Sequence, residues 1–346
     1  MIPYSRQTIN DDDIKAVTDV LKSDFLTTGP KVPEFEQAIC DYCGCDYAVA
    51  FNSGTSALYA AVRVCDNLQE YVSLPANTFI ATANAVLLNG KKLDIIDIGN
   101  NSAKDACDLD MNISVDYAGD NMSDCCIIRD SAHSLGSIER DAYYKKNHKT
   151  GSCYYSEMTC FSFHPLKSIT TAEGGMVTTN NEKYYEKLKA VRDNGRIKGD
   201  SHFPSHNFRM SDIHAALGIS QFKRIDEFVA RRREIAKRYV EAFEGNIKFA
   251  KQNFNHSAYH LFPILLENRD AVREHLTTNE IGTQIHYMPL THHKYLRENK
   301  SMWKAGDLSN AEKWFKTELS IPIYPDLKNN QVDFIIEKIL EVAECR

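Results

Sequence analysis

The sequence has no apolar run long enough to cross a bilayer and no surplus of positive charge. Its formal net charge is −6 and its pI is near 6.1, which leaves no broad basic surface to attract nucleic acid or an anionic membrane. The one basic run, Arg231 to Arg233, lies inside a helical pattern and is interpreted as a solvated helix face. Residues 1–6 lack the apolar core of a secretory signal. We therefore expect a cytoplasmic protein that has neither nucleic acid nor a membrane as a partner.

The sequence also lacks a zinc motif, although it contains ten cysteines. Cys40, Cys43 and Cys45 lie close together, as do Cys125 and Cys126, but a zinc site needs two well-spaced pairs, and no second CxxC or HxxxH partner is present. The spacing of Cys40 and Cys43 fits one face of a helix. We therefore expect reduced thiols and no metal.

Short β-rich runs alternate with helical patterns through the middle of the chain, and several are apolar throughout, as strands buried on both faces are. This alternation predicts an α/β fold with a mostly parallel, seven-stranded sheet and helices on both faces. A chain of 346 residues can also form a second domain, so we expect a large domain at 1–235 and a smaller α+β domain at 236–346. The seven expected strands are 47–51, 71–74, 93–97, 113–116, 126–129, 159–163 and 176–179.

Polar residues at helix starts mark the main helices. Asn10 stands before three aspartates and an apolar stripe of Ile14, Val17 and Leu21. Ser211 begins a helical pattern that continues without a break signal to residue 243. The other expected elements are helices at 32–42 and 269–279 and strands at 261–265 and 284–287.

A strand, a small polar turn and a helix start follow one another at Phe51 to Leu58. Backbone N–H groups at a helix start are free, the helix dipole favours an anion, and hydroxyl side chains are available in this segment. The GxxxxGK[ST] spacing of a Walker loop is absent. The segment predicts a phosphate site, with an ordinary turn and helix cap as the alternative.

Two further segments place ionisable groups after strands. Asp130 follows the apolar run 126–129, at the strand end where α/β sheets bind ligands, with a helix N-cap as the alternative. Lys167 lies among small polar residues before a Gly-Gly turn, and a partly buried lysine with a lowered pKa can form a Schiff base with a carbonyl cofactor. A solvated surface charge is its alternative. The phosphate segment, the acid and the lysine together supply what pyridoxal phosphate (PLP) needs.

These segments resemble the DegT/DnrJ/EryC1/StrS family of fold-type I, PLP-dependent sugar aminotransferases, along almost the whole chain. VDYAG at 115–119 and His164 in the lysine motif are most similar to the PseC-type branch, which makes UDP-4-amino-4,6-dideoxy sugars. The segments that carry the family resemblance are SGTSAL (53–58), DSAH (130–133), SFHPLKSITTAEGG (162–175), HNFRM (206–210) and HYMP (286–289).

The resemblance implies a role for each matching residue. Lys167 holds PLP as a Schiff base and moves the proton, Asp130 pairs with the pyridine nitrogen, His133 lies beside the ring, and Phe79 stacks on its face. Asn207 is implied to reach the phosphate of the neighbouring subunit's cofactor, which makes the active unit a homodimer. Phosphate contacts are further implied for Gly54, Thr55, Ser56 and Ser162, and contacts to the sugar nucleotide for Tyr4, Arg209, His286 and Tyr287.

The implied reaction moves the amino group of L-glutamate, by way of pyridoxamine phosphate, to C4 of a nucleotide-linked 4-keto-6-deoxy sugar, with UDP as the expected nucleotide. GDP- or dTDP-linked keto sugars, giving perosamine-like or 3-amino products, remain open, as does a 2-acetamido group on the UDP substrate. A non-catalytic fold-type I domain is a further alternative. Dehydratase relatives carry histidine where Lys167 stands, which argues against that activity.

The chain departs from the family in two short connections, 98–112 and 120–129, where relatives place a full helix. Neither shortening affects a motif residue. We therefore expect a trimmed flank of the sheet and an intact catalytic centre.

Overall fold

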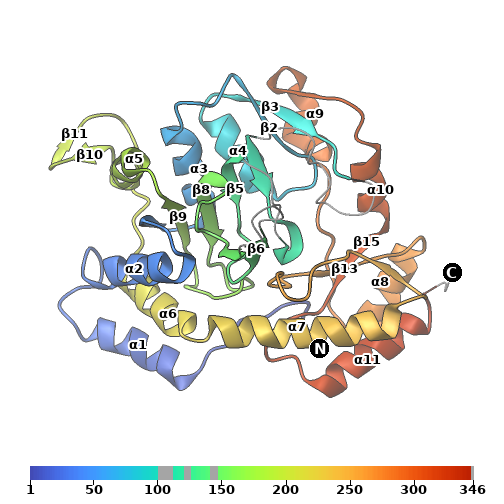
Figure 1. The fold of residues 1–346 in the computed structure, drawn as a ribbon. Coiled ribbons are helices and arrows are strands. Elements are labelled where there is room, and N and C mark those ends of the chain that lie inside the picture. Colours follow the sequence, from blue (N-terminus) through green and yellow to red (C-terminus); the bar gives the residue numbers. More distant parts are fainter. Residues whose placement is uncertain (100–111, 121–125, 141–146, 344–346) are drawn as a thin grey trace.

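The computed structural model describes residues 1–99, 112–120, 126–140 and 147–343, so the two short connections lie largely outside the described residues. A five-stranded sheet lies at the centre of the molecule (Figure 1). Only β9 runs antiparallel to its neighbours, which confirms the prediction of a mostly parallel sheet. In spatial order the strands are β1 (Tyr47–Phe51), β9 (Gly175–Thr179), β8 (Ser156–Ser162), β5 (Cys126–Asp130) and β4 (Ile113–Val115).

A second, parallel sheet lies next to β4 and contains β2 (Tyr71–Pro75), β3 (Lys92–Ile96) and β14 (Trp303–Ala305). The side chain of Asn112 joins the two sheets, because its Oδ1 accepts the backbone N–H of Ser73 at 3.0 Å. All seven predicted strands are therefore present, although a side chain rather than a backbone ladder links β2 to the start of β4. The eighth strand, β14, is too short to give a sequence signal.

Helices cover both faces of the central sheet. Val49 and Phe51 of β1 belong to the core that includes α3 (Gly54–Val64), whereas Ala48 and Ala50 point to the core that includes α2 (Lys31–Cys43). The strands are thus buried on both faces, as their apolar composition predicts. Helices α4 (Ile80–Leu88) and α5 (Glu182–Arg192) pack beside α3, and α1 (Asp11–Leu21) and α6 (Asp212–Phe222) lie on the side of α2. Cys40 and Cys43 both lie on the buried side of α2, in agreement with the prediction that they share one face of a helix.

The C-terminal part of the chain has its own core. An antiparallel sheet of β12 (Lys248–Phe249), β13 (Phe262–Leu265) and β15 (Glu318–Ile321) packs with α7 (Ile225–Phe243), α8 (Arg269–Thr278) and α11 (Asn329–Leu340) (Figure 1). The strand predicted at 284–287 is wrong, since a single bridge from Gln284 to Ser320 takes its place. Because β14 pairs with β3 in the second parallel sheet, residues 236–346 do not all lie in the C-terminal layer, and the boundary at 235 stays a prediction.

Short elements complete the described part of the chain. They are η1 (Tyr117–Gly119), β6 (Ile138–Arg140), β7 (Asn147–Lys149), β10 (Arg196–Ile197), β11 (Asp200–Ser201), η2 (Leu290–His292), α9 (Lys294–Glu298), η3 (Lys300–Met302) and α10 (Ser309–Thr317). Among the described helices, none has both the length and the apolarity that a bilayer span requires.

The prediction of one continuous helix from residue 211 to residue 243 is wrong, because the chain breaks between α6 and α7. Arg224 has a non-helical ψ of 9° and turns the chain between them. Its guanidinium and the side chain of Gln221 both donate to Asp13 Oδ2 at the start of α1, at 2.5 and 2.6 Å. These contacts hold the break in place. They depend on a residue about 210 positions away, and the apolar periodicity does not reveal them.

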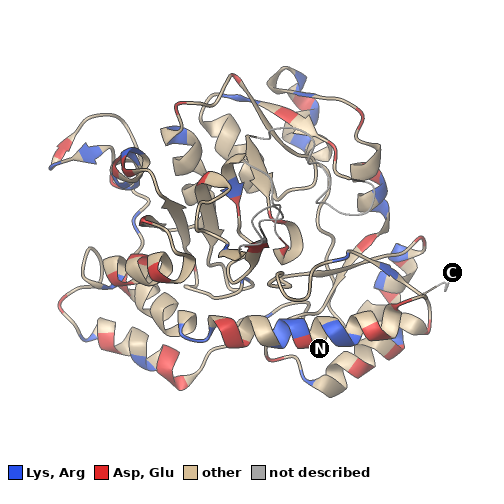
Figure 2. Cartoon of the chain, in the orientation of Figure 1, with Lys and Arg blue, Asp and Glu red and all other residues tan. Residues whose placement is uncertain are grey.

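The interpretation of residues 231–233 as a solvated face is also wrong for Arg232. Figure 2 shows basic residues along α7, but Arg232 is only 1% exposed. Its Nη1 donates to the carbonyl oxygens of Ile323 at 2.7 Å and His260 at 3.3 Å. Arg232 thereby connects α7 to two segments of the C-terminal part, one of which carries His260. Burial lowers the pKa of Arg232 to about 10, which leaves it charged at neutral pH.

We expect Arg232→Met to lower the stability of the fold. The substitution keeps an unbranched side chain but leaves buried carbonyl oxygens without a donor, which costs about 2–4 kcal/mol. The matched control is Arg238→Met on the same helix, which removes only an exposed ion pair with Asp333. Thermal unfolding of the three proteins should show a lower midpoint for Arg232→Met and nearly equal midpoints for the control and the parent. Equal midpoints for the two variants would contradict this role.

Candidate active site

A cavity of about 520 Å³ opens at the carboxyl ends of the central strands, where α/β sheets bind ligands. The register pairs Val115 with Asp130 and Asp130 with Cys160, so β4, β5 and β8 end at the same edge of the sheet. Ten of the thirteen predicted site residues line this cavity, namely Tyr4, Gly54, Thr55, Phe79, Asp130, His133, Ser162, Lys167, His286 and Tyr287.

The N-terminus of α3 forms one wall of the cavity. Ser53 caps the helix, because its Oγ accepts the backbone N–H of Ser56 at 3.1 Å. A Cβ atom at Gly54 would lie 2.7 Å from Cβ of Ser162, so only glycine lets the helix start approach the end of β8 this closely. The result is a helix N-terminus and a serine hydroxyl at one wall, a setting that suits a phosphate group.

Ser56 is not among the residues that line the cavity. Its hydroxyl lies 2.7 Å from Asn52 Oδ1 and donates to it, and its side chain closes the capping box with Ser53. The structure therefore gives Ser56 a part in shaping the helix start. Its predicted phosphate contact stays a prediction.

Asp130 ends β5 and is buried, with 5% of its surface exposed. Its Oδ2 accepts the hydroxyl of Thr82 at 2.7 Å, and its Oδ1 accepts the backbone N–H of Ala132 at 3.2 Å. Burial raises the pKa of Asp130, whereas the two hydrogen bonds and the charge of Lys167 act in the opposite direction. The carboxyl group is thus held rigidly and lies within electrostatic reach of the lysine.

Lys167 lies in the loop after β8, where its backbone N–H donates to the carbonyl oxygen of His164 at 2.9 Å. Lys167 is partly exposed to the cavity. Even so, desolvation of its amine by the surrounding protein lowers the pKa of Lys167 to about 8. The nearby carboxyl of Asp130 opposes this shift without cancelling it. A neutral amine is therefore accessible near physiological pH, as nucleophilic attack on a carbonyl requires.

His133 lies in the same cavity and is 5% exposed. Its Nε2 lies 3.1 Å from the hydroxyl of Tyr287, and its ring centroid is 4.2 Å from that of His260. Among the described residues, no group bonds to its buried Nδ1. Burial lowers the pKa of both histidines, so these rings are neutral at physiological pH.

Aromatic side chains border the rest of the cavity. Phe79 stands just before α4, is 56% exposed, and has its ring centroid 6.0 Å from that of Tyr287. The ring of Tyr4 is 5.9 Å from that of His286. These rings offer flat apolar surfaces for a bound ring system.

Asn207 and Arg209 lie away from the cavity in this chain. Asn207 is exposed, and its Oδ1 accepts the backbone N–H of Arg209 at 3.2 Å. The guanidinium of Arg209 pairs with Asp193. The predicted contacts of Asn207 with a neighbouring subunit's cofactor and of Arg209 with the sugar nucleotide stay predictions.

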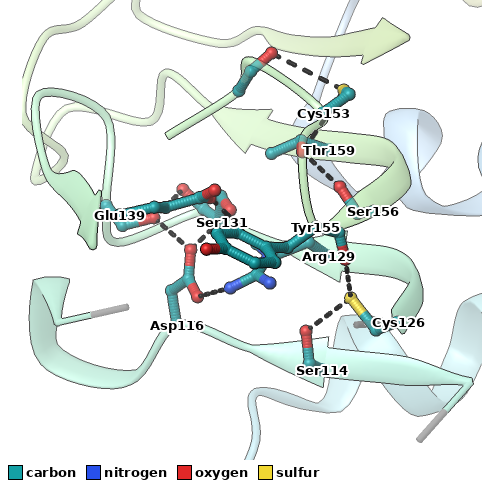
Figure 3. A network of polar contacts seen from close by, with 12 residues as sticks. Ser114, Asp116, Cys126, Arg129, Ser131, Glu139, Cys153, Tyr155, Ser156 and Thr159 are labelled. Atoms are coloured by element: carbon teal, nitrogen blue, oxygen red, sulfur yellow. Dashed lines mark hydrogen bonds and ion pairs between the residues drawn. The ribbon is translucent and has the colours of Figure 1, made fainter. Parts of the chain in front are cut away.

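A buried polar network lies behind the edge of the sheet that carries Asp130 (Figure 3). Asp116 accepts hydrogen bonds from the hydroxyls of Ser131 and Ser134, both at 2.6 Å, and its Oδ1 lies 3.2 Å from Nη1 of Arg129. Glu139 also lies near Arg129, with 3.8 Å between its Oε1 and Nε of the arginine. The network fixes the main chain on both sides of Asp130.

The sequence reading missed several residues that belong to the site. Thr82 bonds to Asp130, Thr78 lies 2.7 Å from Thr82, and the ring of His260 packs against that of His133 in a tilted arrangement. The spacing of Thr78 and Thr82, four apart at a helix start after the second strand, is a signal that could have placed both on one face. No local pattern marks His260.

Comparison with known proteins gives the same assignment. The model of the "DegT/DnrJ/EryC1/StrS aminotransferase family" matches residues 7–113 and 105–340. The UDP-4-amino-4,6-dideoxy-N-acetyl-beta-L-altrosamine transaminase of Campylobacter jejuni strain 81-176 is 35% identical over 379 residues, which cover 99% of this chain and 98% of the relative.

Solved structures extend the likeness to three dimensions. PseC of Helicobacter pylori, an aminotransferase of pseudaminic acid biosynthesis, superposes with a TM-score of 0.88 at 30% identity over 98% of both chains. Spr1654 of Streptococcus pneumoniae, in its PLP form, superposes with a TM-score of 0.85 at 26% identity over 98% of this chain and 97% of the other. The predictions of fold type I and of an aminotransferase are confirmed. The chain belongs to the DegT/DnrJ/EryC1/StrS aminotransferase family.

Proposed function

We propose that this protein uses PLP to transfer the amino group of L-glutamate to C4 of a UDP-linked 4-keto-6-deoxy sugar, for glycan biosynthesis. One observation carries the proposal: the amine of Lys167 and the carboxyl of Asp130 lie in the same cavity, beside the N-terminus of α3. The names of the Campylobacter and Helicobacter relatives supply the class of substrate.

The residues of the cavity fit PLP. The N-terminus of α3 and Ser162 suit its phosphate, Asp130 suits a protonated ring nitrogen, and the amine of Lys167 suits its aldehyde. The buried Nδ1 of His133 has no partner among the described residues and is available to a polar group of the ring. When bound, PLP supplies an electron sink for the carbon that loses its proton.

Asp130 would keep the ring nitrogen of the cofactor protonated. Thr82 and Ala132 hold its two oxygens in place, so its orientation needs no rearrangement. In the free protein burial raises the pKa of Asp130. A cation beside a carboxyl group favours the ionised form, so a protonated ring nitrogen would offset that shift and form a buried ion pair.

Lys167 would move the proton. With a pKa of about 8, its amine exists in both protonation states near neutral pH, as an efficient acid and base needs. It would accept a proton from Cα of the amino donor and hold it beside the bound cofactor, whose electron sink would stabilise the carbon left behind. When the keto sugar is the substrate, the amine of Lys167 would deliver a proton to C4 of the sugar.

The active unit is proposed to be a homodimer. Four large apolar residues of α1 and the turn after it are exposed, by between 48% and 57% of their surfaces: Ile14, Leu21, Phe25 and Leu26. Exposed apolar side chains that gather in this way are typical of a protein–protein contact. The carbonyl of Leu26 accepts the backbone N–H of Asp212, so one end of this region lies against the chain just after Asn207 and Arg209. Contact between two copies through this region would cover the apolar side chains and bring Asn207 toward the partner's cofactor.

We also propose a cytoplasmic location. The seven cysteines in the described ranges are free thiols, and most of them are buried. Proteins of oxidising compartments usually pair their cysteines.

A substrate panel tests the proposed reaction. We expect the purified enzyme with L-glutamate to aminate UDP-linked 4-keto-6-deoxy sugars with the highest kcat/KM, as detected by mass spectrometry of the product. Substrates with and without a 2-acetamido group belong in the panel. A preference for a GDP- or dTDP-linked sugar would move the assignment to a different branch of the family, and no amination at all would favour a non-catalytic domain.

Lys167→Ala should reduce turnover by at least about 10⁴-fold, because the variant loses both the covalent anchor and the proton carrier. Lys187→Ala on α5 is the control, since Lys187 forms only an exposed ion pair with Asp66. Borohydride reduction of the parent, followed by peptide mapping, should find the cofactor attached at position 167. Attachment elsewhere, or turnover by the alanine variant, would refute the assignment.

Asp130→Asn should retain PLP but lose at least about 10²-fold in kcat, since an amide cannot keep the ring nitrogen protonated. Asp333→Asn on α11 is the matched control, because Asp333 lies at the surface and, among the described residues, forms an ion pair with Arg238 alone. Bound PLP is measured by absorbance and kcat by product formation. Unchanged kcat in Asp130→Asn would exclude the ion pair as a catalytic requirement.

A further inference from the structure

His286, Ser320 and Glu318 form a ring of hydrogen bonds at the edge of the cavity. The Nδ1 of His286 lies 2.8 Å from Oγ of Ser320, which lies 2.6 Å from Oε1 of Glu318. The other carboxyl oxygen, Oε2, accepts the backbone N–H of His286 at 2.7 Å. Glu318 therefore holds the main chain of His286 directly and the ring of the same residue through Ser320.

Strand β15 makes this arrangement possible. Glu318 and Ser320 are two residues apart on the strand, so their side chains point to the same face. The carbonyl oxygen of His286 accepts the hydroxyl of Tyr117 at 2.6 Å and the indole N–H of Trp314 at 3.0 Å. His286 lines the cavity, and among the described residues no group bonds to its Nε2, which is thus available to a bound molecule.

The protonation state of Glu318 determines whether Nε2 of His286 donates or accepts a hydrogen bond. Ser320 has one hydroxyl hydrogen, so it can donate to only one of its two partners. If Glu318 is ionised, Ser320 donates to it and must accept from Nδ1–H, which leaves Nε2 as an acceptor. If Glu318 is in its acid form, Oε1–H donates to Ser320, and Ser320 donates to Nδ1. The neutral ring then carries its hydrogen on Nε2.

The surroundings favour the acid form. Glu318 is 0% exposed and forms no ion pair with a described residue, and an unpaired buried carboxylate is costly. Burial raises the pKa of Glu318 to about 8, against the hydrogen bonds from Ser320 and His286 and the charge of Arg269. Burial also lowers the pKa of His286 to about 3, so the ring is neutral.

The charges around the cavity favour a neutral hydrogen-bond donor at Nε2 of His286. Among the described residues that line the cavity, one is a basic residue, Lys167. Three are acidic, namely Asp116, Asp130 and Glu173. L-glutamate and a sugar diphosphate are both anionic, and their oxygens accept hydrogen bonds. A neutral N–H group serves such oxygens without the cost of burying another charge.

We propose that Glu318 in its acid form and Ser320 are positioning residues, which hold His286 in the tautomer with its hydrogen on Nε2, so that this nitrogen donates to a substrate oxygen. The identity of that substrate rests on the proposed function. The tautomer itself does not, because the protein alone determines it.

Other ionisable groups also face this network. Around Glu318 they are Arg269, Tyr117 and Tyr287. Around His286 they are Lys167, Tyr4, His133 and His260. The pKa of Lys167 is also about 8, so a pH profile of the parent protein alone would not separate Lys167 from Glu318.

The Glu318→Gln variant separates the ionisation of Glu318 from that of Lys167. The backbone N–H of His286 needs an acceptor, so the amide oxygen takes the place of Oε2 and the NH₂ group faces Ser320. Ser320 then donates to Nδ1 at every pH, and Nε2 keeps its hydrogen. The variant therefore removes the ionisation of Glu318 and leaves Lys167 unchanged.

Nitrogen-15 NMR of protein labelled at histidine reads the tautomer directly, with the signals of His286 identified by their loss in His286→Gln. In the parent, we expect Nε2 to be protonated below pH 8 and to lose its hydrogen to Nδ1 as the pH rises through about 8. In Glu318→Gln, Nε2 should stay protonated over the whole range. A parent signal that does not change with pH, or a variant that changes as the parent does, would overturn the proposal.

Kinetics test the consequence for the substrate. Ser320→Ala interrupts the chain and should raise KM for the sugar nucleotide about fivefold with little change in kcat, while Ser320→Thr should restore most of the loss. Ser156→Ala is the matched control, because Ser156 bonds to Thr159 at the start of β8, away from the cavity. Unchanged KM in Ser320→Ala would refute the role in binding. Failure of the aminotransferase assignment would appear separately, as turnover that survives loss of Lys167.

Discussion

Removal of water from one cavity sets the chemistry of this protein. Burial pushes the amine of Lys167 toward its neutral form and the carboxyl of Asp130 toward its acid form, while the attraction between the two opposes both shifts. Lys167, with a pKa of about 8, thus has its neutral amine accessible, and a cofactor that carries an aldehyde and a basic ring nitrogen can react with this amine and pair with the buried carboxyl of Asp130. The same burial keeps His133 and His260 neutral. A more open site would leave an ordinary ammonium and an ordinary carboxylate, with neither an accessible nucleophile nor a strong ion pair.

The sheet determines where these groups meet. Because β4, β5 and β8 are parallel and in register, the residues at their ends converge on one edge, where α3 also begins. The buried network of Asp116, Arg129 and Glu139 holds this edge together, and its geometry resists distortion because breaking a buried ion pair costs far more than forming it gains. The catalytic geometry therefore depends on backbone register, with the side-chain network as its support.

The parts of this architecture that could be predicted from the sequence are those with local signals. Apolar runs marked the seven strands, and Lys167 and Asp130 stood in short motifs at strand ends. The break between α6 and α7 gave no such signal, because it depends on Asp13, and the burial of Arg232 depends on carbonyl groups far along the chain. His260, Glu318 and Ser320 were missed for the same reason, since each contacts a partner that only the fold brings close, His133 for the first and His286 for the other two.

The two ends of the chain contribute different chemistry to the cavity. The segments before residue 180 supply the ionisable groups and the helix terminus that suit the cofactor, whereas the segment from His260 to Tyr287 supplies neutral imidazole and phenol groups. Within the described residues the cavity of one chain is lined by more carboxyl groups than amines, although the proposed substrates are anionic. A neutral N–H donor such as Nε2 of His286 resolves part of this mismatch. In the proposed homodimer, Asn207 of the partner subunit would add a further neutral hydrogen-bond donor, since the same residue does not line the cavity of its own chain.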